Sequence, residues 1–198
     1  MAVSLKVACV YKTGGVYTPE YVRRLKAGVE KHLHWPFEWV CLSDDPEVAT
    51  HALHENLPGW WSKFELMTLS GGRVLYFDLD TVIHGDITPL AHVEQLTLLQ
   101  DFYRPDGLGS GLMMLPETDR AGMWDFWEKS PHGHMGRFAI EGDQAVMELQ
   151  WLDRAARWQD ILPGMVVSYK AHTLFQRAKA SVTCYHGQPK PHETGWEA

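Results

Sequence analysis

The sequence predicts an α/β fold, a single domain over 1–198 with a mixed, mostly parallel sheet and flanking helices. Three observations support this prediction. The 198 residues, of which 45% are hydrophobic and 22% charged, fit one globular domain. The chain opens with a predicted strand, helix and strand over 5–11, 18–33 and 37–42, and a second helix and strand follow over 62–78. This order is typical of a parallel sheet covered by helices.

The first strand, helix and strand have clear boundaries. The run LKVACVY over 5–11 is almost entirely apolar, as in a strand that is covered on both faces. Thr18 stands where a helix N-cap is expected, and Pro19 stands at the first helical position. One apolar stripe at helical spacing follows, formed by Val22, Leu25, Val29 and Leu33. The strand FEWVCL over 37–42 then ends at a turn sequence, Ser-Asp-Asp-Pro.

The second helix begins with a capping signal. Ser62 and Glu65 form the S-x-x-E pattern before an apolar run, which predicts an α-helix that ends at Gly71 and Gly72. The segment RVLYFD over 73–78 is the next predicted strand. Further strands are expected over 95–100, 111–115, 165–169 and 181–185, and further helices over 119–129 and 143–152.

Composition excludes several classes of function. Lys and Arg number 18 against 25 Asp and Glu, a formal net charge of −7 without a basic tract, which argues against nucleic acid as a partner. The three cysteines form no C-x-x-C pair, so neither a disulfide framework nor a thiolate zinc site is expected. No apolar stretch approaches the roughly 18 residues of a membrane span, and the first residues do not resemble a signal peptide. We therefore expect a cytoplasmic protein; the sequence leaves its oligomeric state open.

The sharpest local signal is an Asp-x-Asp pair at the end of the predicted strand 73–78. Asp78 and Asp80 are two residues apart, so both side chains point to one side if the extended geometry continues. Open α/β sheets bind ligands beyond the carboxyl ends of their strands, and paired carboxylates there attract a hard divalent cation. A solvated turn is the alternative, because Asp is common in turns. The apolar runs on both sides of the pair favour the cation site.

One enzyme class with such a pair is the haloacid-dehalogenase-like phosphatases. Their first Asp is a nucleophile and their second an acid–base group, in a motif that usually opens the chain and continues Asp-Gly-Thr. Here Thr81 follows Asp80 without a glycine, and the later Gly142-Asp143 opens a predicted helix. A phosphatase that uses Asp78 as its nucleophile therefore stays as an alternative.

Several motifs, in order along the chain, point to another family. The region around 61–90 contains WWSKFEL, VLYFDLDTVI and HGDITPL, and later come GSGLMM at 109–114, GDQ at 142–144 and CYHGQPKP at 184–191. These motifs resemble those of the GT-A glycosyltransferases, especially the retaining group around glycogenin and the bacterial lipooligosaccharide galactosyltransferases. The resemblance extends from about residue 5 to residue 191 and implies a Rossmann-like GT-A fold.

The resemblance implies that the protein moves a sugar from a nucleotide diphosphate donor, expected to be UDP-linked, to an acceptor that the sequence does not name. Tyr11, Lys12 and Thr13 would bind the base and ribose. The remaining donor-binding candidates are Lys63, Asp78, Leu79, Asp80, Ser110, Gly111, Gly187 and Lys190, and the catalytic candidates are Asp143, Gln144 and Lys190. A catalytically inactive nucleotide-sugar-binding domain is a further alternative.

The resemblance also implies a divalent cation, Mn²⁺ or Mg²⁺, held by Asp78, Asp80 and a third ligand. The family carries this third ligand three residues before the glycine of its last motif, where this chain has Cys184. His186, one residue before Gly187, is the nearest imidazole. Since a nitrogen with carboxylate oxygens suits Mn²⁺ and a thiolate selects softer metals, we expect His186 to complete the site. A hydrogen-bonded loop histidine is the alternative.

Overall fold

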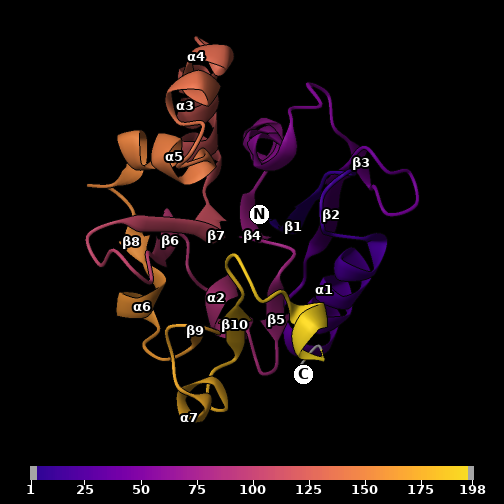
Figure 1. The fold of residues 1–198 in the computed structure, drawn as a ribbon, viewed down its shortest axis with the longest axis vertical. Coiled ribbons are helices and arrows are strands. Elements are labelled where there is room, and N and C mark those ends of the chain that lie inside the picture. The colour runs from indigo at the N-terminus through magenta and orange to yellow at the C-terminus, as the bar shows by residue number, and fades with distance from the viewer. Residues whose placement is uncertain (1–3, 196–198) are drawn as a thin grey trace.

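The structure is a computed structural model and describes residues 4–195. Its main sheet consists of β1 (Leu5–Tyr11), β2 (Glu38–Ser43), β3 (His51–Ala52), β4 (Arg73–Phe77), β6 (Thr97–Gln100), β7 (Leu108–Leu115) and β8 (Ala156–Arg157). The seven strands lie in the order β3-β2-β1-β4-β7-β6-β8 (Figure 1). The first four in this order are parallel, and so are β6 and β8, whereas β7 is antiparallel to both of its neighbours. The predicted α/β fold with a mixed, mostly parallel sheet is confirmed.

A second, smaller sheet begins just beyond the carboxyl end of β4. It has the order β5-β10-β9 and consists of β5 (Thr81–Ile83), β9 (Val166–Ser168) and β10 (Val182–Cys184). β10 is antiparallel to β5 and parallel to β9. Just after β10, the Tyr185 amide donates a hydrogen bond to the Asp80 carbonyl at 3.0 Å. The small sheet therefore brings the C-terminal motif next to the Asp-x-Asp pair.

Helices cover both faces of the main sheet. Alternate residues of β4 face opposite sides: Leu75 packs in one core cluster with Leu25 of α1 (Pro19–His32). Tyr76 packs in the other cluster with Phe64 of the 3-10 helix η1 (Gly59–Thr68) and Trp127. The remaining helices are α2 (Thr88–Ala91), α3 (Glu117–Trp127), α4 (Pro131–Arg137), α5 (Asp143–Trp151), α6 (Trp158–Ile161), α7 (Leu174–Arg177) and η2 (Pro191–Thr194). Within residues 4–195, no helix has the length and apolar character that crossing a membrane requires.

The predicted capping box at Ser62 is wrong. The segment is a 3-10 helix that starts three residues earlier, and the Ser62 hydroxyl donates to the Gly59 carbonyl at 2.7 Å. The Glu65 carboxylate instead accepts hydrogen bonds from the amides of His54 and Glu55, because the preceding loop folds back over it. Since η1 packs between the sheet and α3, it buries every side chain from Trp61 to Met67, including the charged Lys63.

The boundaries near the two Gly-rich motifs are only partly as predicted. β7 begins at Leu108, three residues before the predicted strand over 111–115, so Ser110 lies within a strand. The strand starts early because β6 pairs with this stretch at Gly109 and Leu108. α5 begins at Asp143, as predicted, and Gly142, with a φ of 76°, is its N-cap. Both elements hold the polar side chains of these motifs in fixed positions.

Candidate functional site

Asp78 and Asp80 lie at the turn that joins the two sheets. The Asp78 amide donates to the Gly111 carbonyl of β7 at 2.8 Å, and the Thr81 amide donates to the Asp78 carbonyl at 3.1 Å. These bonds fix the chain as it leaves β4 and enters β5. The side chain of Asp80 is buried, with only 6% of the residue exposed. The pair is therefore not a solvated turn, and it lies beyond the carboxyl end of β4, where open α/β sheets bind ligands.

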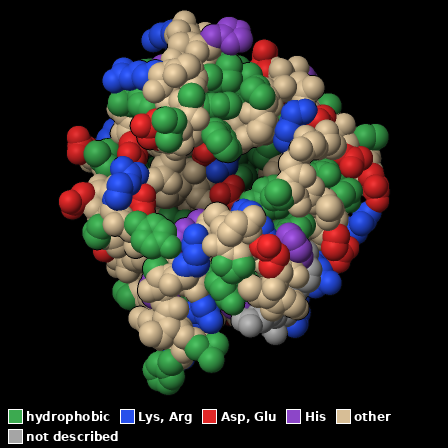
Figure 2. Space-filling model, in the orientation of Figure 1, with side chains coloured by type: hydrophobic (Ala, Val, Ile, Leu, Met, Phe, Trp, Pro, Cys, Tyr) green, Lys and Arg blue, Asp and Glu red, His purple; other side chains and the backbone are tan. Residues whose placement is uncertain are grey.

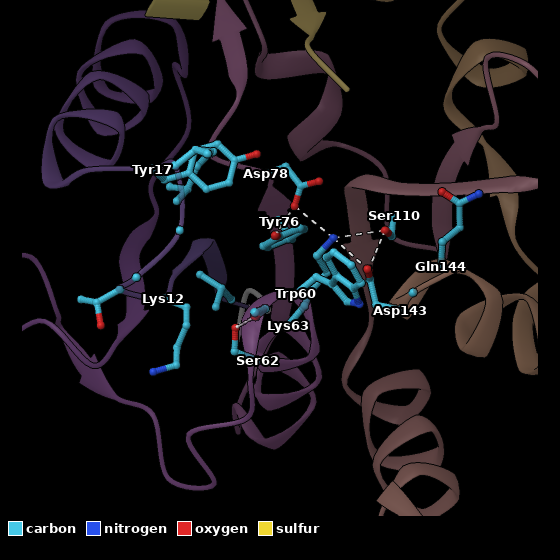
Figure 3. A pocket seen from close by; sticks show the side chains of 18 of the residues that line it. Lys12, Tyr17, Trp60, Ser62, Lys63, Tyr76, Asp78, Ser110, Asp143 and Gln144 are labelled. Carbon is cyan, nitrogen blue, oxygen red and sulfur yellow. Dashed lines mark hydrogen bonds and ion pairs between the residues drawn. The ribbon is translucent and has the colours of Figure 1, made fainter. Parts of the chain in front are cut away.

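A buried ammonium group joins three elements beside this turn. Lys63 Nζ of η1 lies 3.0 Å from Asp78 Oδ1 and 2.9 Å from Asp143 Oδ2 of α5. It also donates to the Ser110 hydroxyl of β7 at 3.1 Å, and that hydroxyl donates to Asp143 Oδ2 at 2.7 Å. Figure 3 shows the side chains of Asp78, Ser110 and Asp143 around Lys63 Nζ. The network fixes the Asp143 carboxylate relative to the Asp-x-Asp pair.

The carboxylates around Lys63 decide its charge. Burial alone would lower the pKa of Lys63, but Asp143 and Asp78 outweigh it and raise this pKa above its usual value. The side chain is therefore a cation at neutral pH. A second hydrogen bond reaches Asp78, from the Tyr76 hydroxyl to Asp78 Oδ1. The other oxygen of Asp78, Oδ2, lies 3.3 Å from where a Cβ of residue Gly111 would stand, so glycine leaves this oxygen room.

A second ammonium group contacts the other aspartate. Lys190 Nζ forms an ion pair with Asp80 Oδ2 and donates to the Tyr17 hydroxyl at 2.6 Å. The Tyr17 hydroxyl in turn donates to Asp80 Oδ2 at 2.8 Å. Burial, and then the negative charge of Asp78, raise the pKa of Asp80 even so. Two like charges thus lie close together at this turn, each beside a lysine, and a further cation there would lower their repulsion.

Two cavities meet at this charged turn. The larger, of about 670 Å³, lies between the loop after β1, the start of η1 and the start of α5 (Figure 3). Its wall includes Lys12, Thr13, Lys63, Asp78, Leu79, Ser110, Asp143, Gln144 and Lys190. The smaller, of about 330 Å³, is bordered by Asp80, Gly111, Cys184, His186 and Gly187. Asp78, Ser110, Gln144, Lys190 and Tyr17 border both. Figure 2 shows a hollow in the middle of this face with acidic and basic side chains inside it.

The expected third metal ligand has other contacts. His186 Nε2 is 2.6 Å from the Ser168 hydroxyl, and its ring stacks on Phe102 with centroids 5.3 Å apart. Cys184 is buried in β10 opposite Thr81, and burial, followed by the charges of Asp80 and Asp78, raises the pKa of its thiol. Within residues 4–195, no three His, Cys, Asp or Glu side chains are grouped so as to hold a metal ion. The structure therefore does not assemble the predicted triad, and Mn²⁺ or Mg²⁺ stays a prediction.

The carboxylates themselves fit a hard cation. Asp78 and Asp80 border the same cavity, and carboxylate oxygens are the ligands that Mg²⁺ and Mn²⁺ take. Burial raises the pKa of Asp80 and the charge of Asp78 raises it further, and a divalent ion would relieve the repulsion between the two carboxylates. These two residues are thus the part of the predicted metal site that the structure supports.

Of the three residues expected to bind the base and ribose, Lys12 and Thr13 border the larger cavity and Tyr11 borders neither cavity. Lys12 forms an ion pair with Asp44, and Thr13 donates to the Asp44 carboxylate through its amide at 2.9 Å and its hydroxyl at 2.8 Å. Burial raises the pKa of Asp44, but the bonds from Lys12 and Thr13 outweigh it and lower this pKa to about 2. Tyr11 is 5% exposed and packs in the core against Tyr21, away from the lining of both cavities.

Gln144 lies where the two cavities meet, as its place at the start of α5 requires. Its side-chain amide donates to Asp101 Oδ2 at 2.9 Å, which ties α5 to the loop after β6. Burial raises the pKa of Asp101, but the amides of Tyr103 and Arg104, together with Gln144, lower it overall. The hydrogen bond to Asp101 therefore fixes the Gln144 side chain at the border of the smaller cavity.

Four further residues contact the predicted site residues and were not predicted from the sequence: Tyr17, Tyr76, Asp44 and Asp101. Tyr76 could have been found, because it stands two residues before Asp78 on the same side of the strand. Tyr17 follows the glycines Gly14 and Gly15, which mark a loop but not its contact with Asp80, 63 residues away. Contacts at such separations carry no local pattern.

The fold that carries this site is that of the GT-A glycosyltransferases, as predicted. No protein-family model and no curated protein matches the sequence. Solved structures with the same fold include the apo form of the glycosyltransferase GlyE of Streptococcus pneumoniae TIGR4, at a TM-score of 0.65 and 18% identity. The match covers 98% of this chain and 60% of the GlyE chain, so this chain spans less than two thirds of that protein.

Two other similar structures are also glycosyltransferases. The galactosyltransferase LgtC, in a complex with donor and acceptor sugar analogues, matches with a TM-score of 0.64 and 12% identity over 94% of this chain and 88% of LgtC. The bifunctional glycosyltransferase WbbM matches with a TM-score of 0.60 and 13% identity over 96% of this chain and 47% of WbbM. At these identities the likeness establishes the fold alone, and the activity depends on the residues of the site.

Proposed function

We propose that this protein is a metal-dependent glycosyltransferase that moves a sugar from a nucleotide diphosphate donor, UDP-linked, to an acceptor. The observation that supports this function most strongly is the arrangement of Lys63, Asp78 and Asp143 around one cavity on this fold. The volume of about 670 Å³ lies in the usual range of small-molecule sites. The three free, buried cysteines support a reducing compartment, which agrees with the expected cytoplasmic location.

The reaction breaks the bond between the anomeric carbon and the β-phosphate oxygen, so negative charge grows on the departing diphosphate. Lys190 borders both cavities and offers an ammonium group to that charge. Its contact with the Tyr17 hydroxyl fixes the ammonium before the donor arrives. Gly187, with a φ of 69°, lets the backbone of the last motif approach the diphosphate closely.

Asp78 and Asp80 would hold the divalent ion. When bound, such an ion supplies Lewis-acid stabilisation of the leaving diphosphate. Lys63 keeps the Asp78 carboxylate in place through the 3.0 Å contact and keeps Asp143 beside the larger cavity. Asp143 and Gln144 begin α5 and face the side of the site where donor sugar and acceptor would meet. We also propose His186 as the third ligand of this ion. Because its Nε2 contacts Ser168, the ring would have to leave Ser168 or bind the ion through Nδ1.

The experiment is to incubate the protein with UDP-hexoses and Mn²⁺ and to measure UDP release with and without added sugar acceptors. We expect release by the wild type and a fall of at least about tenfold in Asp143→Asn, because the amide carries no negative charge toward the reacting sugar. Asp153→Asn is the matched control, since Asp153 is exposed beyond the end of α5.

The alternatives give different results in the same assay. A protein that binds UDP-hexoses but transfers no sugar to any acceptor or to water, and so releases no UDP, would be an inactive binding domain. This result would contradict the proposal. Phosphate release from a phosphomonoester with Mg²⁺, lost in Asp78→Asn, would instead identify the phosphatase. The three similar structures named above are glycosyltransferases, which supports transfer over both alternatives.

A further inference from the structure

The connection between β9 and β10, residues 169–181, ends in an exposed apolar tip. Leu174 and Phe175, the first two residues of α7, are each 68% exposed. Thr173 and Gln176 form a complete capping box across them, which fixes the short helix that carries both side chains. Other exposed apolar residues such as Trp60 and Ile140 border the larger cavity, whereas Leu174 and Phe175 border neither catalytic cavity. The donor site therefore does not explain their exposure.

The same connection is basic. It contains Lys170, Arg177 and Lys179 and neither Asp nor Glu, in a chain with a formal net charge of −7. Lys179 Nζ lies 4.0 Å from the centre of the Phe175 ring. The Arg177 guanidinium lies 4.1 Å from the ring of Tyr169, whose carbonyl it also contacts. In Figures 1 and 2, α7 forms the lower end of the molecule, where hydrophobic side chains project and basic ones lie just above them.

We infer that residues 169–181 dock on the surface of an anionic lipid bilayer. Leu174 and Phe175 would enter the boundary between headgroups and acyl chains, while Lys170, Arg177 and Lys179 contact lipid phosphates. A stable protein partner needs about 800 Å² on each side, far more than two projecting side chains offer. A bilayer accepts so small an apolar tip, because its interface takes single side chains and positive charge adds to their binding.

The position of the tip relates it to the site. The first residue of the connection that carries the tip, Tyr169, stacks on Tyr185 with ring centroids 4.2 Å apart, and Tyr185 borders the smaller cavity. Lys170 Nζ lies 5.9 Å from the ring centre of Tyr103, another residue of that cavity. Docking through this connection would hold the smaller cavity near the headgroups. The inference itself does not depend on sugar transfer and is tested without it.

The test is cosedimentation of the whole protein with vesicles of phosphatidylcholine alone and of phosphatidylcholine mixed with phosphatidylglycerol. We expect binding to the mixed vesicles that weakens as salt rises, and little binding to the neutral ones. The double variant Leu174→Ser with Phe175→Ser is expected to lose about tenfold or more in partitioning. Leu149→Ser, which changes an exposed leucine of α5, is the matched control and is expected to bind as the wild type.

A second variant separates charge from apolar contact. Lys170→Gln with Lys179→Gln keeps the tip and removes two cations, so it is expected to lose the preference for phosphatidylglycerol. Equal binding of the wild type to both vesicles, or unchanged binding of the Leu174 and Phe175 variant, overturns the inference. Self-association without lipid that this variant abolishes would overturn it as well, in favour of a contact between copies. Unchanged UDP affinity in all variants keeps this outcome separate from the proposed function.

Discussion

Lys63→Met is expected to abolish sugar transfer and to lower the free energy of unfolding by about 3–5 kcal/mol, the range for breaking a buried ion pair. Methionine has a similar length but no charge, so the buried Asp143 and the half-buried Asp78 would lose their shared cation. The Ser110 hydroxyl alone would remain beside Asp143. Denaturant unfolding measures the stability, and UDP release from UDP-hexoses measures the activity. Lys129→Met, at an exposed position after α3, is expected to change neither.

A double variant separates the structural part of this effect from the chemical part. Combining Lys63→Met with Asp143→Asn removes one of the stranded carboxylates and is expected to recover most of the lost stability. Transfer is expected to stay absent, because the fixed Asp143 carboxylate is missing. A Lys63→Met protein as stable as the wild type would contradict the buried charge network.

Lys190→Met is expected to slow UDP release by about 10²–10³-fold, the range for loss of one preorganised donor to a developing negative charge. Lys190 contacts Asp80 and Tyr17 and borders both cavities, so its ammonium group is fixed where the diphosphate would bind. Tyr17→Phe is expected to have a smaller effect, because it keeps the ammonium and removes one hydroxyl. Lys26→Met, on the exposed side of α1, is the control. A Lys190→Met enzyme that releases UDP at the wild-type rate would remove this residue from the mechanism.

Much of the fold could be predicted because its signals are local. Continuous apolar runs predicted strands over 5–11 and 73–78, and an apolar stripe at helical spacing predicted the first helix. The structure has β1, β4 and α1 at these places. The predicted α-helix after Ser62 is a 3-10 helix, since the Glu65 side chain is taken by the loop before it. Two-residue strands such as β3 have no period at all, so only their partners define them.

The site was predictable where the chain itself brings residues together. Asp78 and Asp80 lie at a strand end, as their spacing indicates. Lys63 was predicted only as a donor-binding residue, whereas the structure also gives it Asp143, which is 80 residues away, as a partner. Such a pairing depends on how η1 and α5 pack, which no local pattern encodes. The same holds for His186, whose nitrogen contacts Ser168 of a neighbouring strand.

Calorimetric titration of UDP into the protein, with Mn²⁺ and with a chelator, tests the central claim most directly. Binding at least about tenfold tighter with Mn²⁺ is expected, with this gain lost in Asp80→Ala and kept in Asp153→Ala. The carboxylates at the turn between the two sheets would then hold a cation that grips the diphosphate. Equal UDP affinity with the chelator, or an Asp80→Ala protein that still shows the full gain, would contradict it.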